Sequence, residues 1–235
     1  MPKFEFFAIS DIAIIPPEPM IKHLPDWYKN LEAYIGGKKG VPFQETGHST
    51  MKKCIPVLDA LSAGYMMFTQ VDFITEYRKG VRHWWWAANA EPHKDLITNH
   101  SIESVAGHPK IISDSIPWKM ESPWGIRTPK GWSTLFMPPL YQDNPIFEIF
   151  TGLVDTDTYR VPVNHPFYLM DEDFEGTIPC GTPLAQIIPV KRENWEIKII
   201  NSEKEKNAIL RENTHRSRYF WNGYKKLFWS PKSYK

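Results

Sequence analysis

The sequence predicts a mainly β protein, an antiparallel sandwich or jelly roll with a few helices. Hydrophobic residues make up 42% of the chain and aromatic residues 14%, which is enough to fill a packed interior. The chain has 21 prolines and 13 glycines, and this balance favours short elements joined by rigid turns over long helices. At 235 residues it fits one large domain with an appendage. We therefore expect a single β-rich domain over residues 1–200 and a basic, amphipathic helical tail over residues 201–235.

The first quarter of the chain predicts one strand and two short helices. Residues 4–15 are mostly apolar and end at a Pro-Pro pair, as an edge or first strand does. Residues 25–31 place apolar side chains at helical spacing after a possible Asp26 cap. The following stretch, 36–53, has the composition of an exposed loop. Residues 51–63 then show three- and four-residue apolar intervals, which predict a helical turn or two.

Strands are predicted from residue 65 onward. Residues 65–71 and 73–77 are rich in β-branched and aromatic side chains, which favours strands. They are followed by the tryptophan run Trp84, Trp85 and Trp86. Because successive side chains of a strand point to opposite faces, at least one tryptophan must line a second surface. That surface is either a pocket or a contact with another segment, and the alternative is that the three rings close the core between two layers.

The later segments continue the antiparallel pattern. Further strands are expected at 146–154, 167–170, 184–190 and 195–200. From residue 203 to about 228 the pattern becomes that of an amphipathic helix, with an interruption expected near Gly223. Its apolar face should dock on the body of the protein or on a second copy.

The charge is unevenly distributed along the chain. The formal net charge is +1, but residues 191–235 hold 12 Lys or Arg against 5 Asp or Glu, and residues 1–190 hold 16 against 22. A basic tail can contact an acidic partner, nucleic acid or the acidic surface of its own body, and the last is the simplest interpretation. Basic and aromatic residues alternate in the tail as they would on a docked helix, so nucleic-acid binding is not expected.

The cysteine content and hydropathy indicate a soluble, cytoplasmic protein. Only Cys54 and Cys180 occur, too few for a disulfide framework, which fits a reducing compartment. No apolar run has the length of a membrane span, and the N-terminus lacks the pattern of a signal peptide. We expect the cytoplasm, of a host cell if the protein is phage-encoded, or a virion.

Two sets of residues could bind a metal. One set combines His93 and Asp95 with the distant His165, which would form the facial triad of a non-haem iron oxygenase. The alternative is that His93 and Asp95 lie in an ordinary loop. The other set is acidic, and such carboxylates either bind a hard cation or form plain solvated turns. It comprises Asp155, Asp157, Asp171, Glu172, Asp173 and Glu175.

No complete catalytic motif is present. Ser133 and Cys180 lack the surroundings of a nucleophile, and the glycine- and lysine-rich stretch at 36–40 does not have P-loop spacing. A small-molecule enzyme would need groups assembled in space. Its pocket would collect Asp59, Asp155, Asp157, His165 and Arg127.

Three segments resemble motifs of a known fold. The stretches at 131–133, 152–159 and 181–187 follow one another at intervals similar to motifs two, three and four of the trimeric dUTPase and dCTP deaminase fold. The resemblance implies a β-clip-like or jelly-roll-like fold. It also implies that Asp155 activates water toward a nucleotide and that Tyr159 packs under the deoxyribose.

The chain departs from that pattern at three places. Trp132 stands where the second motif has a phosphate-gripping arginine, an extra residue separates Asp155 from Tyr159, and no glycine-rich arm follows at the C-terminus. A site without its arginine clamp loses phosphate affinity.

A second resemblance extends over nearly the whole chain. The stretches at 25–29, 53–65, 124–133 and 181–189 resemble an uncharacterised family of bacterial and tailed-phage proteins, including those of phages of marine cyanobacteria. The resemblance implies a bacterial or phage origin and one folded unit with a helical tail, and it supplies no catalytic residues and no cofactor.

The sequence therefore favours a binding or assembly protein, plausibly phage-encoded and virion-associated, that associates through an aromatic surface and its C-terminal helix. The residues expected to bind a partner or ligand are Trp84, Trp85, Trp86, Trp124, Arg127, Trp132 and Ser133. The alternative is an enzyme, either a dUTPase-like nucleotide hydrolase or a non-haem iron oxygenase, and its catalytic candidates are Asp155, Tyr159 and His165.

Overall fold

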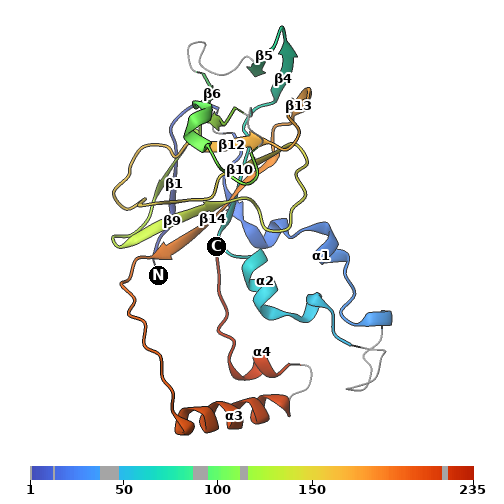
Figure 1. Cartoon of the computed structure of the whole chain (residues 1–235), viewed down its shortest axis with the longest axis vertical. Helices are drawn as coiled ribbons and strands as arrows, with labels where there is room; N and C mark the ends of the chain where they lie inside the picture. The colour runs from blue at the N-terminus through green and yellow to red at the C-terminus, as the bar shows by residue number, and fades with distance from the viewer. Residues whose placement is uncertain (1, 13, 38–47, 87–94, 112–115, 219–221) are drawn as a thin grey trace. The chain divides into compact units, whose positions relative to one another are not determined.

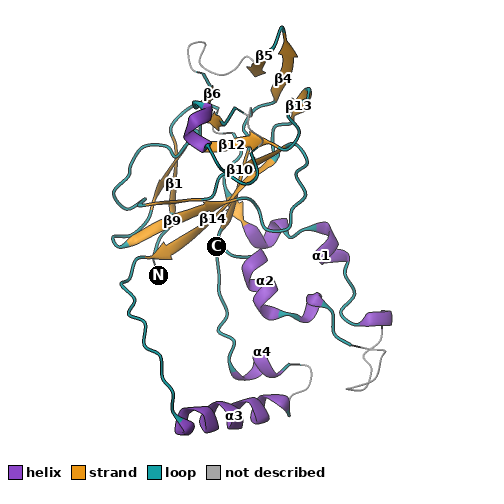
Figure 2. Ribbon diagram, viewed as in Figure 1, coloured by secondary structure: helices purple, strands orange, loops and turns teal. Residues whose placement is uncertain are grey.

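The computed structural model describes residues 2–12, 14–37, 48–86, 95–111, 116–218 and 222–235 (Figure 1). Most of its regular structure is antiparallel β-sheet, as the sequence predicts (Figure 2). The chain divides into two compact units. Unit 1 comprises residues 1–20 and 64–192, and unit 2 comprises residues 21–63 and 193–235. The predicted division at residue 200 stays a prediction.

The strands form four sheets, and every strand pair among the described residues is antiparallel. The largest has the order β11 (Gly152–Val154), β9 (Trp132–Met137), β14 (Pro183–Lys191), β3 (Tyr65–Phe68) and β2 (Glu18–Pro19). A second has the order β10 (Phe147–Ile149), β12 (His165–Leu169), β7 (Trp118–Met120) and β6 (Ile97–Asn99). A third has the order β13 (Gly176–Ile178), β4 (Phe73–Arg78) and β5 (Val81–Trp86), and β1 (Glu5–Ala8) pairs with β8 (Trp124–Arg127).

The core of unit 1 is built from the inward-facing side chains of these sheets. Phe147, Phe167, Ile178 and Ile187 are at most 2% exposed, and each comes from a different strand. Strand β14 is central, because it pairs with β9 on one side and with β3 on the other. The segments at its two ends are therefore held by neighbours from distant parts of the chain.

Unit 2 is mainly helical. Its helices are α1 (Asp26–Asn30), α2 (Ile55–Leu61), α3 (Glu203–Ser217) and α4 (Gly223–Leu227). Short 3-10 helices lie at Met20–His23, Ile35–Gly37 and Met51–Lys53, and a fourth lies in unit 1 at Ile102–Val105. Two polar contacts join segments of unit 2 that are far apart in the sequence. Lys52 donates to the carbonyls of Tyr28 and Lys29, both at 2.8 Å, and Asp59 accepts bonds from Trp229 and Lys232.

Several predicted elements are confirmed and others need correction. The helices near residues 26 and 56 are present, and the tail helix is interrupted before Gly223 as expected. The first strand ends at Ala8 instead of Ile15, because the chain bends at Ser10 and turns at Asp11 and Ile12. The predicted strand at 146–154 is two strands, β10 and β11, in different sheets. Most of the predicted loop at 36–53 lies outside the described residues.

Candidate functional site

Three segments of unit 1 meet at one end of the largest sheet. Strand β9 lies between β11 and β14, so the loop before β9, the turn after β11 and the last residues of β14 are neighbours (Figure 1). Ser133 is the second residue of β9, residues 155–159 form the turn, and Arg192 directly follows β14. The turn closes through bonds from the N–H groups of Thr158 and Tyr159 to Asp155 O, at 3.0 and 2.8 Å.

Arg192 joins the three segments through one guanidinium. Its Nη1 lies 3.0 Å from Ser133 Oγ, 2.9 Å from Asp157 Oδ1 and 3.0 Å from Asp155 Oδ1. Its Nη2 pairs with the second oxygen of Asp157, so that contact is bidentate. The main chain adds a bond from Arg192 N–H to the carbonyl of Gly131 at 2.8 Å. We call Ser133, Asp155, Asp157 and Arg192 the arginine clamp.

The two carboxylates of the clamp differ in exposure. The Asp157 side chain is 4% exposed, and it also accepts a bond from Gly131 N–H at 2.8 Å. The hydrogen bonds from Arg192 and from the Gly131 amide lower the pKa of Asp157 to about 2, so it is ionised at neutral pH. The Asp155 side chain is 60% exposed and accepts a bond from Ser133 Oγ at 2.7 Å. Asp157 is therefore a structural anchor, and Asp155 is the carboxylate open to solvent.

A buried set of threonine hydroxyls supports the clamp from beneath. Thr156 Oγ1 lies 2.8 Å from Thr128 Oγ1 and 2.7 Å from Thr134 Oγ1. Thr128 Oγ1 also donates to Trp132 O at 2.9 Å. All three threonines are at most 5% exposed. The strand β9 and the turn after β11 are thus tied together inside the protein as well as at its surface.

The arginine clamp holds Arg192, the last residue of unit 1. Residues 193–202 follow directly and form neither helix nor strand (Figure 2). Their apolar side chains alternate with polar ones, yet Trp195 is 85% exposed, Ile197 90% and Ile199 91%. We call residues 193–200 the arm. The sequence predicts a strand at 195–200, and the structure has no strand there: none of the described sheets includes these residues.

The catalytic candidates are only partly brought together. Asp155 and Tyr159 share the turn after β11, and Tyr159 is 46% exposed. His165 is in the core on β12, 2% exposed, beside the Phe136 ring at 5.6 Å between centroids. Burial lowers the pKa of His165 to about 4, so its imidazole is neutral at pH 7. Asp155 is solvent-exposed and His165 is enclosed, so they do not face a common surface.

The remaining residues of the predicted enzyme pocket have other partners. Arg127 pairs with Glu5 at 3.8 Å and lies over the Phe7 ring at 4.6 Å. Asp59 accepts bonds from Trp229 Nε1 and from Lys232 Nζ, the latter at 2.7 Å, within unit 2. The role of each as a ligand-binding or catalytic group stays a prediction.

The tryptophan run alternates across β5. Trp84 packs against Trp118 and Phe167, with ring centroids 5.5 and 5.9 Å away, and Trp86 is also packed against the core. Trp85 is 38% exposed and lies under the Arg78 guanidinium at 5.2 Å. One ring therefore does line a second surface, as the strand geometry requires.

The predicted metal ligands do not form a group in the described part of the chain. His93 lies outside the described residues, Asp95 is exposed and His165 is buried. No three His, Cys, Asp or Glu side chains among the described residues are placed to hold a metal. In the acidic set, Asp171 accepts from Asp173 N–H at 3.0 Å within a local turn, whereas Glu175 accepts from Tyr77 N–H of β4 at 2.7 Å.

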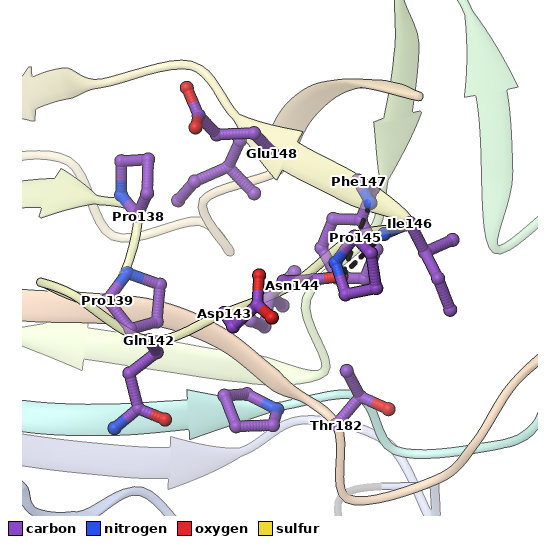
Figure 3. Close-up of a pocket in the computed structure, with 13 residues that line it drawn as sticks. Pro138, Pro139, Gln142, Asp143, Asn144, Pro145, Ile146, Phe147, Glu148 and Thr182 are labelled. Atoms are coloured by element: carbon purple, nitrogen blue, oxygen red, sulfur yellow. Dashed lines mark hydrogen bonds between the residues drawn. The ribbon is translucent and has the colours of Figure 1, made fainter. Parts of the chain in front are cut away.

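A cavity of about 200 Å³ opens beside strand β10. Prolines form much of its wall, and β10 contributes Phe147 and Ile149 (Figure 3). Asn144 Oδ1 accepts from the N–H groups of Ile146 and Phe147, which closes the turn that leads into β10 (Figure 3). The exposed carboxylate of Asp143 lies on the rim.

The second carboxylate at this cavity is Glu148. It accepts hydrogen bonds from Lys110 and Tyr168. Burial opposes ionisation of Glu148, but the bonds from Lys110 and Tyr168 outweigh it and lower the pKa of Glu148. Burial and the bond to Glu148 raise the pKa of Tyr168 to about 12. The cavity wall is therefore largely apolar, and of its two carboxylates Asp143 is exposed while Glu148 is paired with Lys110.

Comparison with known proteins identifies no family. No family model matches the chain, and no curated protein matches it. Among solved structures, a mutant dUTPase from phage phi11 of S. aureus has a TM-score of 0.37 and 11% identity, over 85% of this chain and 97% of that chain. A mutant dUTPase of Staphylococcus phage 80alpha has a TM-score of 0.39 and 11% identity, over 85% and 90%. TM-scores this low, at such identity, establish neither a shared fold nor a shared activity.

Sequence reasoning missed Arg192, the arm and the cavity. Arg192 is a single basic residue after a strand, and no local motif distinguishes it. The alternation of Trp195, Ile197 and Ile199 was the available signal for the arm, since it predicts a strand that needs a partner. The cavity is formed by 138–149 and 182–184, which only the fold brings together.

Proposed function

We propose that this protein assembles with copies of itself through the arm. The observation that carries the proposal is the exposure of Trp195, Ile197 and Ile199, each at least 85%. Strand-forming apolar segments left in water are sites of association, and folded proteins usually pair or cover them. The arginine clamp supports the same function, because it holds Arg192, the residue directly before the arm, on unit 1.

Charge favours a second copy as the partner. Residues 191–235 carry a net charge of +7, and residues 1–190 carry −6. The basic tail of one copy is therefore complementary to the acidic body of another. Helix α3 adds apolar surface, because Ile209 is 65% and Leu210 53% exposed. No described helix is both long and apolar enough to cross a membrane.

The test is the oligomeric state of an arm variant. We expect wild-type protein to be oligomeric in sedimentation velocity, and Ile197→Asp combined with Ile199→Asp to be monomeric. Each buried isoleucine contributes about 1.5–3 kcal/mol, so losing two should weaken association at least about 100-fold. The control is Asn201→Asp combined with Asn207→Asp, which adds the same charge at exposed polar positions. A monomeric wild type, or equal association of both variants, would contradict the proposal.

A second candidate is hydrolysis of a nucleoside triphosphate at Asp155. It is favoured by the Ser133–Asp155 bond of 2.7 Å, which orients a solvent-exposed carboxylate where two of the segments that resemble dUTPase motifs, 131–133 and 152–159, meet. The assay is release of pyrophosphate from dUTP with Mg²⁺ present. Hydrolysis lost in Asp155→Asn but kept in Asp171→Asn would support this candidate. An inactive wild type would exclude dUTP as its substrate.

A further inference from the structure

The main chain of the arm has no protein partner in the described part of the molecule. Residues 193–201 are all exposed, and none of residues 194–201 makes a hydrogen bond with another described residue. The side chains of Trp195, Ile197 and Ile199 recur at every second residue, which is the period of a strand. A segment with unpaired main-chain groups and this pattern is a template for pairing with another strand.

Both ends of the exposed stretch are held in place. Arg192 is fixed by the arginine clamp, and Ser202 caps helix α3 by accepting from Glu205 N–H. The stretch available for pairing is therefore 193–201, and its middle residue is Ile197.

Two copies of this stretch are complementary when they run antiparallel about Ile197. Each residue then lies opposite the one at the same distance on the other side of Ile197, so the stretch pairs over its whole length. Trp195 of one copy lies opposite Ile199 of the other, and the two Ile197 side chains lie opposite each other, so all the apolar side chains share one face. Glu196 of one copy lies opposite Lys198 of the other, and this pair occurs twice because the arrangement is two-fold symmetric.

Charge distinguishes this register from its neighbours. A shift that keeps the apolar side chains on one face must move the pairing by an even number of residues. Centring the pair on Glu196 places two glutamates opposite each other, and centring it on Lys198 places two lysines opposite each other. Like charges directly opposite destabilise a strand pair, whereas unlike charges stabilise it. Only the register centred on Ile197 opposes unlike charges without opposing like ones.

We propose that the arms of two copies pair with each other as antiparallel strands centred on Ile197. The proposal deepens the assembly function and rests on it, because it names the arm of a second copy as the partner of the arm. Glu196 and Lys198 set the register of the pair.

Charge reversal tests the register. Glu196→Lys and Lys198→Glu each turn both attractive pairs into repulsive ones, although they change the net charge in opposite directions. We expect each variant alone to have a dissociation constant at least about 10-fold above that of the wild type in sedimentation velocity. An equimolar mixture of the two variants again opposes unlike charges at both positions, so we expect the mixture to associate about as tightly as the wild type.

The matched controls are Glu212→Lys and Lys204→Glu, which make the same changes at exposed positions of α3 outside the paired stretch. We expect each to stay within about 3-fold of the wild-type dissociation constant. An oligomeric wild type with arm variants that associate normally, or that mixing does not rescue, would overturn the pairing of arms and leave self-assembly standing. A monomeric wild type would overturn both.

A disulfide gives a second readout of the same register. Directly opposite residues of antiparallel strands have Cα atoms about 4.5–5.5 Å apart, a separation that a disulfide spans. Position 197 lies opposite itself, whereas position 199 lies opposite Trp195. We therefore expect oxidised Ile197→Cys to form a covalent dimer with a 197–197 disulfide, identified by mass spectrometry, and Ile199→Cys to form no 199–199 disulfide. Equal yields of the two disulfides would contradict the register.

Discussion

Replacing Gly64 with alanine is expected to destabilise the protein by about 3–5 kcal/mol. Gly64 has φ +73°, a left-handed conformation that side chains disfavour. A Cβ atom added there would lie 1.9 Å from the carbonyl oxygen of Ile187. That oxygen belongs to the backbone of the central strand β14, so it cannot move aside without disturbing the sheet. Gly64 also accepts a hydrogen bond from Met20 N–H at 3.0 Å.

The measurement is the free energy of unfolding from urea titrations followed by far-UV circular dichroism. Gly80→Ala is the control, because Gly80 has a similar φ of +78° and nothing lies within 4 Å of the added Cβ. Gly80→Ala should lower the free energy of unfolding only by the backbone strain, about 1–2 kcal/mol. If the two variants lose equal stability, close packing at Gly64 is not the cause.

Acidification is expected to destabilise the protein through His165. Its pKa is about 4 in the folded protein, against 6.5 ordinarily, because burial disfavours the charged imidazolium. Between these values the unfolded chain binds a proton that the folded protein excludes. The contribution of His165 to stability is therefore full above pH 6.5, and it is lost as the pH falls from 6.5 to 4. The total loss is about 3 kcal/mol.

An apolar replacement should remove this dependence. Nε2 of His165 is buried without a hydrogen-bond partner among the described residues, so His165→Leu gives up no polar contact of that atom. We expect a flatter curve of unfolding free energy against pH between 4 and 6.5 than in the wild type. The control is His100→Leu, which makes the same substitution at an exposed histidine. Parallel curves for wild type and His165→Leu would show that another group controls acid unfolding.

The sequence predicts the class of fold because side-chain periodicity is local. The alternation of side chains in β4 and β5 can be recognised without reference to the rest of the chain, and so can the helical spacing of apolar residues near residues 26 and 55. Strand ends were harder to predict. The first strand stops at Ala8 because the chain turns, and the apolar residues that follow, such as Ile12, pack against the core without pairing.

The candidate site was only partly predictable for a different reason. Asp155 and Ser133 belong to local patterns, but Arg192 becomes part of the site only because β14 pairs with β9 in a register that places Lys191 opposite Trp132. His165 shows the opposite error. It was a catalytic and metal-ligand candidate, whereas it is the first residue of β12 and is 2% exposed.

The hydroxyls of Thr134, Thr156 and Thr128, beneath the arginine clamp, form a row of hydrogen bonds that all run in one direction. A carbonyl oxygen can only accept a hydrogen bond, so the Thr128 hydroxyl donates its proton to Trp132 O. Thr156 must then donate to Thr128, and Thr134 must donate to Thr156. The three hydroxyl dipoles are aligned, with their hydrogen ends directed toward the Trp132 carbonyl oxygen, which also accepts from Arg192. Thr134→Val would therefore remove only the first donor, whereas Thr128→Val would remove both the acceptor of the Thr156 proton and the hydroxyl that donates to Trp132 O.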